Sequence, residues 1–314
     1  IAQSRSDIEI AAIRTHLSAE QCAYLLKHDS IYGHYAKAIG TGDASLYVGD
    51  RIIPIISDKR TTKLPWDDLG IDVLIDAGCQ TDAAELRRHR TAGARRVASL
   101  SQCADFATIV MGVNEETYDP AKHHIISNGS CTTNCLAPVA KVLSREFGIV
   151  RGMMTTIHSY TNDQHLVDSV HKDLRRARCA TQSIIPTSTG AAQAVALVLP
   201  ELKGKFTGMA LRVPTPNVSM TDLVAVLEKS VTKEEVNGAL KKWAEGPLKG
   251  ILAYSEDATV SSDYISDTHS SIVDALDTQV IGGNMIKVVA WYDNEWGYSL
   301  RVNDLAAYIG AKGL

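Results

Sequence analysis

The feature that most constrains the fold is the alternation of short apolar runs with helical stretches over the first 130 residues. Helical patterns fall at 19–27 and 82–92. The apolar runs predict strands at 8–13, 72–76, 96–100, 108–113 and 124–127, and two more on either side of Gly49-Asp50 within 45–56. Strands that alternate with helices at this spacing are typical of βαβ units. The pattern predicts an α/β fold, with a doubly wound, Rossmann-type dinucleotide-binding domain built on a mainly parallel sheet.

The second half of the chain has a different pattern. Longer β runs at 153–158, 207–213 and 287–292 are separated by helical patterns at 190–199 and 233–244. Such segregation predicts an α+β catalytic domain with a mixed or antiparallel sheet. Apolar residues at helical spacing predict a last helix that returns to the first domain. We therefore expect a dinucleotide-binding domain over 1–130, joined by the helix 298–314, and a catalytic domain over 131–297.

Composition narrows the class of protein. The 314 residues are 45% hydrophobic and carry a net charge of −4, which argues against a disordered chain and against a nucleic-acid partner. No apolar run approaches the roughly 18 residues of a spanning helix, so we expect no membrane insertion. The six cysteines include no C-x-x-C pair, and the histidines lack ligand spacing. This pattern indicates reduced thiols, a cytoplasmic location and no metal site.

Cys131 is the candidate nucleophile. It lies in a cluster of small polar residues, Ser127 to Cys135, where a predicted strand ends and a helix begins near Ser130. Free N–H groups and the positive end of the helix dipole favour a thiolate there, so we expect a lowered thiol pKa. The alternative is a small buried cysteine under a helix, and Cys135 keeps that interpretation.

His158 is the candidate partner for this thiol, because a cysteine nucleophile usually works with a histidine. It ends an apolar β run, where a loop begins. Anion sites are also indicated. Thr189 and Gly190 open a predicted helix whose N–H groups suit a phosphate. Arg212 lies within a β run, and a basic stretch covers 175–178. A helix cap and solvated arginines are the alternatives, and together these residues favour a phosphorylated substrate.

These blocks resemble one family. SCTTNCL at 130–136, HSYTNDQ at 158–164, HKDLRRAR at 171–178, PTSTGAA at 186–192, RVPTPNVS at 212–219 and WYDNEWGY at 291–298 look like phosphorylating glyceraldehyde-3-phosphate dehydrogenase. The resemblance implies that Cys131 attacks the aldehyde to give a thiohemiacetal. Hydride transfer to the nicotinamide then leaves a thioester that inorganic phosphate cleaves. His158 would act as the base.

The resemblance also assigns the binding residues. The phosphate of glyceraldehyde 3-phosphate would be held by Thr161, Asp163, Arg176 and Arg212. Inorganic phosphate would be held by Ser130, Thr189 and Gly190. Asn294 would fix the nicotinamide carboxamide, with Tyr298 near the ring. The family further implies a homotetramer, with the segment 160–185 near a neighbouring cofactor site.

The departures from the family lie on the cofactor side. The chain begins at Ile1 without Met and without the G-x-G-x-x-G turn, as though about twenty residues were missing and it entered in mid-helix. Gly40-Thr41-Gly42 is a weak look-alike. Arg14-Thr15 replaces the family's Asn-Asp, and Ser169-Val170 replaces Leu-Pro. Both changes favour NADP, alone or together with NAD, because a cation in place of the carboxylate tolerates a 2′-phosphate.

Two blocks that line the dinucleotide in the family also differ, at Ala77-Gly78-Cys79 and Leu100-Ser101-Gln102. Two alternatives therefore remain beside the leading hypothesis. One is the related erythrose-4-phosphate dehydrogenase, although Tyr160 to Asp163 and Pro214-Thr215-Pro216 favour the triose enzyme. The other is a scaffold protein that has lost its cofactor site.

Overall fold

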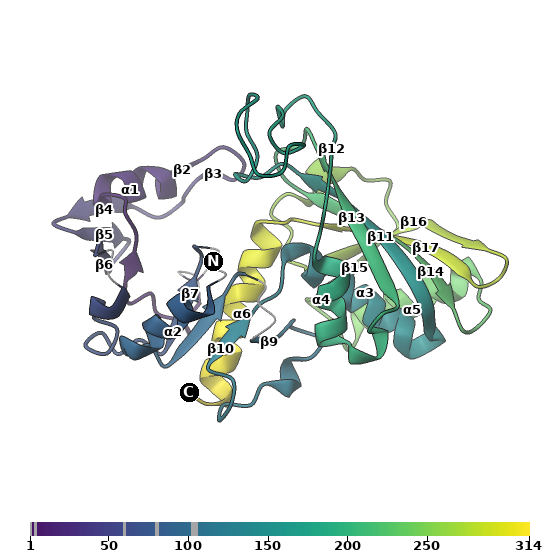
Figure 1. The fold of residues 1–314 in the computed structure, drawn as a ribbon, viewed down its shortest axis with the longest axis horizontal. Coiled ribbons are helices and arrows are strands. Elements are labelled where there is room, and N and C mark those ends of the chain that lie inside the picture. The colour runs from purple at the N-terminus through teal and green to yellow at the C-terminus, as the bar shows by residue number, and fades with distance from the viewer. Residues whose placement is uncertain (1, 3–4, 59–60, 79–81, 102–105) are drawn as a thin grey trace. The chain divides into compact units, whose positions relative to one another are not determined.

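The computed structural model describes residues 2, 5–58, 61–78, 82–101 and 106–314, and the chain forms two compact units (Figure 1). Unit 1 comprises 1–107, 118–128 and 302–314, and unit 2 comprises 108–117 and 129–301. Parts of three sequence expectations lie outside the described residues. They are Ile1 and Gln3 of the expected mid-helix start, and Cys79 and Gln102 of the two altered cofactor blocks.

Unit 1 contains two four-stranded sheets. The first has the order β1-β6-β5-β4, and its β1 and β6 pair in parallel. The second has the order β7-β8-β10-β9, and its β7, β8 and β10 are parallel. The bounds are β1 Ile13–Arg14, β4 Ile39–Gly42, β5 Ser45–Val48, β6 Arg51–Ile56, β7 Val73–Asp76, β8 Arg96–Ser99, β9 Ala107–Thr108 and β10 Ile125–Ser127.

Two helices of unit 1 begin at side-chain caps. In α1 (Ala19–Lys27), Ser18 and Gln21 form a capping box, and in α2 (Ala83–Thr91) the Asp82 carboxylate accepts the N–H of Ala84. Such caps satisfy N–H groups that have no partner inside the helix. The sequence placed both helices correctly. A small hairpin, β2 (His28–Asp29) with β3 (Gly33–His34), follows α1 directly.

Unit 2 is built on a seven-stranded mixed sheet of order β12-β13-β11-β14-β17-β16-β15. The pairs β11/β13 and β15/β16 are parallel, and the other pairs are antiparallel. The bounds are β11 Ile149–Ser159, β12 Ile185–Thr187, β13 Phe206–Val213, β14 Ser219–Leu227, β15 Leu252–Ser255, β16 Ser271–Ile281 and β17 Met285–Tyr292.

Helices α3 (Cys131–Phe147), α4 (Ala191–Val198) and α5 (Lys233–Glu245) contact this sheet (Figure 1). Alternate residues of β14 are buried, as expected for a strand with one face against the core. The main core of unit 2 joins that face to side chains of α3 such as Leu136 and Leu143. The long helix α6 (Trp296–Lys312) ends the chain, and 3-10 turns lie at Thr61–Lys63, Glu115–Thr117, Pro200–Leu202 and Ser261–Tyr264.

The predicted fold class is confirmed, and two of the predicted strands are wrong in extent. The run 8–13 contributes only Ile13 to β1, and the run 108–113 contributes only Thr108 to β9. Ile109 and Val110 are nevertheless fully buried. The apolar side chains in these two runs pack in a core although their backbone does not pair with a strand. Hydrophobic periodicity cannot distinguish such a segment from a strand. Gly40-Thr41-Gly42 lies within β4, so it is not a phosphate-binding turn.

Candidate active site

Cys131 is the first residue of α3. Ser130 is the N-cap, and its hydroxyl accepts the N–H of Thr133 at 3.0 Å. Gly129 precedes it with φ of +65°, a conformation that glycine adopts at little cost. The predicted helix start is therefore confirmed, and the sulfur lies in the first helical turn.

His158 lies near the end of β11 and reaches the same sulfur. The distance from Cys131 Sγ to His158 Nε2 is 3.5 Å. The Nδ1 atom lies 2.7 Å from the carbonyl oxygen of Ser159. Nδ1 also lies 3.1 Å from Nη1 of Arg212, which can only donate. Because the carbonyl can only accept and its contact is the shorter one, we assign the ring proton to Nδ1, which leaves the Nε2 lone pair facing the thiol. This tautomer can take a proton from Cys131.

Burial sets the pKa values of the pair. Burial raises the pKa of the Cys131 thiol, although the Arg212 guanidinium and N–H groups of the first helical turn oppose the increase. The predicted lowering of this pKa is therefore wrong in its net direction, because desolvation outweighs the helix terminus. Burial and the nearby Arg212 lower the pKa of His158 to about 3. Each group taken alone thus favours its neutral form.

Tyr292, which the sequence did not single out, connects the elements that carry the pair. Its hydroxyl lies 2.9 Å from the hydroxyls of both Thr132 and Thr156, and its ring meets the His158 ring edge to face. Tyr292 is fully buried at the end of β17. The only sequence signal was its place in the block 291–298. The contacts fix the start of α3 against β11.

Arg212 on β13 lies beside His158. Its Nη1 atom donates to the hydroxyl of Thr161 at 3.2 Å and to the Ser159 carbonyl at 3.1 Å. Strands β11 and β13 place His158 directly opposite Arg212 in the register. The buried Nε of Arg212 has no hydrogen-bond partner among the described residues. A buried guanidinium donor of this kind requires an acceptor, and an anion would supply one.

Arg176 is held by a second set of contacts. It pairs with the Asp163 carboxylate, its Nε donates to Thr187 Oγ1 at 2.9 Å, and Asp173 lies 3.5 Å away. The Asp173 carboxylate also accepts the Thr187 hydroxyl at 2.9 Å. Burial raises the pKa of Asp163, but the Arg176 contact holds it below its usual range. Both residues lie in blocks that the sequence singled out, but the sequence did not assign to Thr187 and Asp173 the role of fixing this guanidinium.

The remaining predicted residues of unit 2 are placed as follows. Thr189 accepts the Ala191 N–H at 3.2 Å, and Gly190 is the N-cap of α4. The Asn294 amide oxygen accepts the hydroxyls of Ser159 at 3.0 Å and Ser219 at 2.8 Å, which fixes the orientation of the amide. The Tyr298 hydroxyl donates to the Gly129 carbonyl at 2.8 Å.

Arg14 and Thr15 belong to unit 1. Arg14 ends β1, and its exposed guanidinium donates to the Asp58 carbonyl at 3.3 Å. The N–H of Thr15 donates to the Ile56 carbonyl at the end of β6. Both residues therefore lie at the carboxyl ends of parallel strands, where open α/β sheets bind ligands.

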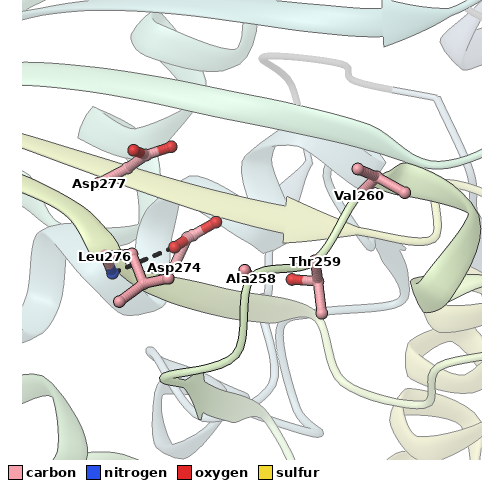
Figure 2. Close-up of a pocket in the computed structure, with 6 residues that line it drawn as sticks. All are labelled: Ala258, Thr259, Val260, Asp274, Leu276 and Asp277. Carbon is pink, nitrogen blue, oxygen red and sulfur yellow. Dashed lines mark hydrogen bonds between the residues drawn. The ribbon is translucent and has the colours of Figure 1, made fainter.

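A separate hollow in unit 2 contains none of these residues (Figure 2). The Asp274 carboxylate in it accepts the Leu276 N–H and the Trp291 indole N–H, so it is engaged within the protein. The other residues that line it are Ala258, Thr259, Val260 and Asp277. Nothing in this hollow resembles the chemistry around Cys131. The described helices include none that could span a membrane, and the described residues hold no group of three metal-ligating side chains.

Comparison with known proteins agrees with this geometry. Residues 130–294 match the family described as glyceraldehyde 3-phosphate dehydrogenase, C-terminal domain, and residues 1–83 match its NAD binding domain. The chain belongs to the glyceraldehyde-3-phosphate dehydrogenase family. It is 58% identical to the glyceraldehyde-3-phosphate dehydrogenase of Geobacillus stearothermophilus, over 98% of this chain and 92% of that protein. The family members of Priestia megaterium and Bacillus subtilis (number 1) are 54% and 53% identical over the whole of this chain, covering 94% of each relative.

Proposed function

We propose that this chain oxidises glyceraldehyde 3-phosphate and joins inorganic phosphate to the resulting acyl group, giving 1,3-bisphosphoglycerate reversibly. The observation that carries the proposal is the approach of His158 Nε2 to Cys131 Sγ beside Arg212, whose buried Nε lacks a partner among the described residues. A thiol, a base and an anion-binding cation in one place fit acyl transfer on a phosphorylated aldehyde.

The residues then have distinct roles. The Cys131 sulfur attacks the aldehyde carbon, and His158 Nε2 accepts the thiol proton and returns it to the carbonyl oxygen. In the resulting thiohemiacetal, His158 takes the hydroxyl proton as the hydride leaves. The sulfur departs when an oxygen of inorganic phosphate attacks the thioester. The hydroxyls of Ser130 and Thr189 and the N-terminus at Gly190 would hold that phosphate.

The substrate phosphate would be held by Arg212, Arg176 and Thr161. Guanidinium groups bind phosphate oxygens well because they present several donors in one plane. Asp163 carries a negative charge and already accepts from Arg176. Asp163 would therefore orient Arg176 and leave the direct contacts to the cations.

A nicotinamide dinucleotide would accept the hydride when bound. The fixed amide of Asn294 suits this group, because two serine hydroxyls engage its oxygen and so set the orientation of the amide. An amide held in one orientation can pair with a carboxamide. Asn294 would hold the nicotinamide carboxamide, and Tyr298 would lie near the ring.

We propose that unit 1 accepts NADP as well as NAD, with NADP favoured. The support is the exposed Arg14 guanidinium at the end of β1, with Thr15 next to it and Ser169-Val170 in place of Leu-Pro. A cation there would pair with a 2′-phosphate. Calorimetric titration with each dinucleotide tests this, and equal or weaker binding of NADP would contradict the preference.

Activity is tested by following reduction of NAD and of NADP with glyceraldehyde 3-phosphate, with and without inorganic phosphate. We expect reduction that depends on both the aldehyde and phosphate. Absence of reduction with either dinucleotide would refute the proposal, and absence of dinucleotide binding would favour a scaffold protein. Faster turnover of erythrose 4-phosphate would favour the related dehydrogenase instead.

We also propose a homotetramer. Large apolar side chains between 166 and 184 are exposed in the single chain, a feature that marks protein interfaces. They are Leu166, Val167, Val170, Leu174 and Ile184. Light scattering on the purified protein measures the oligomeric state directly, and a monomer would contradict the proposal.

A further inference from the structure

Two histidines face each other on the β2–β3 hairpin, outside every residue assigned above. His28 and His34 are directly opposite in the antiparallel register. The His28 N–H donates to the Tyr24 carbonyl of α1, and the hairpin hydrogen bond falls next to the pair, from the Tyr35 N–H to the Lys27 carbonyl. His28 and His34 thus form a non-hydrogen-bonded pair, in which side chains approach most closely.

The imidazole rings meet through equivalent atoms. His28 Nδ1 and His34 Nδ1 are 3.0 Å apart, and the ring centroids are 4.9 Å apart at a steep angle. Both side chains are exposed. In the free chain one Nδ1–H can donate to the other Nδ1. With both protons on Nε2, each Nδ1 atom carries a free lone pair, and the two atoms lie 3.0 Å apart on an exposed hairpin.

We propose that His28 and His34 chelate one divalent late transition metal ion, with nickel or copper preferred over zinc. If an ion lies about 2.1 Å from each of the two nitrogens, which are 3.0 Å apart, the nitrogen–metal–nitrogen angle is about 90°. That is the angle between neighbouring ligands in square-planar and octahedral complexes. Tetrahedral zinc would need the nitrogens about 3.4 Å apart, so the two rings would have to rotate away from each other. Water would fill the other positions.

The hairpin holds the two ligands in place before a metal arrives. The Asp29 carboxylate accepts the N–H groups of Ile31 and Tyr32, both at 2.8 Å, and Gly33 turns the chain with φ of +79°. The Tyr24 ring packs 5.1 Å from that of His28. Asp29 also adds a negative charge to the hairpin, which favours a cation. Pre-organisation of this kind reduces the ordering cost of binding.

The test is calorimetric titration of Ni²⁺ into the full chain carrying Cys131→Ser, which removes the nucleophilic thiol from competition. We expect one site whose affinity falls at least tenfold with His28→Ala, and equally with His34→Ala. The double variant should bind no more weakly than either single variant, because a chelate is lost with its first ligand. His16→Ala, an exposed histidine on the same unit, is the matched control and should leave the site unchanged.

Thermal unfolding provides a second readout, because a ligand that binds the folded chain raises Tm. Ni²⁺ should raise Tm of the Cys131→Ser chain and should not do so after His28→Ala or His34→Ala. Binding that is unchanged in both histidine variants, or reduced in only one of them, would overturn the proposal. So would the absence of a saturable site. Dehydrogenase activity of the histidine variants with Cys131 intact checks that they fold.

Discussion

The two units of the molecule carry their assigned residues in contrasting ways. In unit 2, His158 and Asn294 are 4% and 7% exposed, and hydrogen bonds fix both side chains. In unit 1, Arg14 is exposed at the end of a two-residue strand. Bond-making chemistry requires a fixed geometry, which long strands and a helix start provide. Discrimination between NADP and NAD requires only a positive charge within reach of the 2′-phosphate.

The largest effect should follow from Cys131→Ser, the change that tests the fixed geometry most directly. We expect kcat for aldehyde oxidation to fall at least about 10³-fold, because a hydroxyl is a far weaker nucleophile than a thiol beside the same base. Cys135→Ser, one helical turn further along, is the control and should retain turnover. Steady-state kinetics measure both variants, and comparable losses in the two would remove Cys131 from the proposed role.

A smaller effect should follow from Arg176→Ala, which removes a cation from the proposed phosphate site. Hydrogen bonds to charged groups contribute about 1.5–3 kcal/mol, so kcat/KM should fall about 10- to 150-fold. The matched control is Arg175→Ala, an exposed neighbour on the same loop. The kcat/KM of Thr187→Val should lie between those of Arg176→Ala and Arg175→Ala, since Thr187 positions the Arg176 guanidinium. Equal kcat/KM in all variants would show that the substrate phosphate binds elsewhere.

Acid should destabilise the chain through its buried histidines, one in each unit. Burial lowers the pKa of His158 to about 3 and also lowers that of His89, which accepts the Trp66 indole N–H. Below pH 6.5 the unfolded chain gains protons that the folded chain does not, so the unfolding free energy falls as pH decreases toward the folded pKa. Each such group contributes at most about 1.4 kcal/mol per pH unit.

Denaturant unfolding at pH 7.5 and at pH 5 measures this loss. His158→Gln should reduce the difference in unfolding free energy between pH 7.5 and pH 5. His89→Gln should reduce this difference independently, because the two histidines belong to different units. A difference that is the same in the parent chain and both variants would assign the acid sensitivity to other groups.

The smallest effect should follow from Arg14→Ala in unit 1. Loss of one exposed cation should lower kcat/KM for NADP about tenfold, or about 1.4 kcal/mol, and leave kcat/KM for NAD almost unchanged. Arg51→Ala, also on the first sheet and exposed, is the control. A loss shared equally by both dinucleotides would mean that Arg14 supports the fold of unit 1 and does not recognise a 2′-phosphate.

The sequence by itself determined the fold class, the start of α3 at Ser130 and the choice of Cys131 and His158. These features depend on local patterns and on blocks long enough to identify the family. It overestimated the strands at 8–13 and 108–113 and placed none at β14 or β16, because the extent of a ladder depends on which segments pair across the chain.

Tertiary structure alone decided the electrostatics and the supporting contacts. The helix start predicts a lowered Cys131 pKa, but the net shift is upward because the folded surroundings desolvate the sulfur. Tyr292 supports the start of α3 from a distant part of the sequence, and Thr187 and Asp173 fix Arg176 once the chain has folded. Sequence records which groups are present. Their burial, and hence their charge and orientation, depends on the packing of segments that lie far apart along the chain.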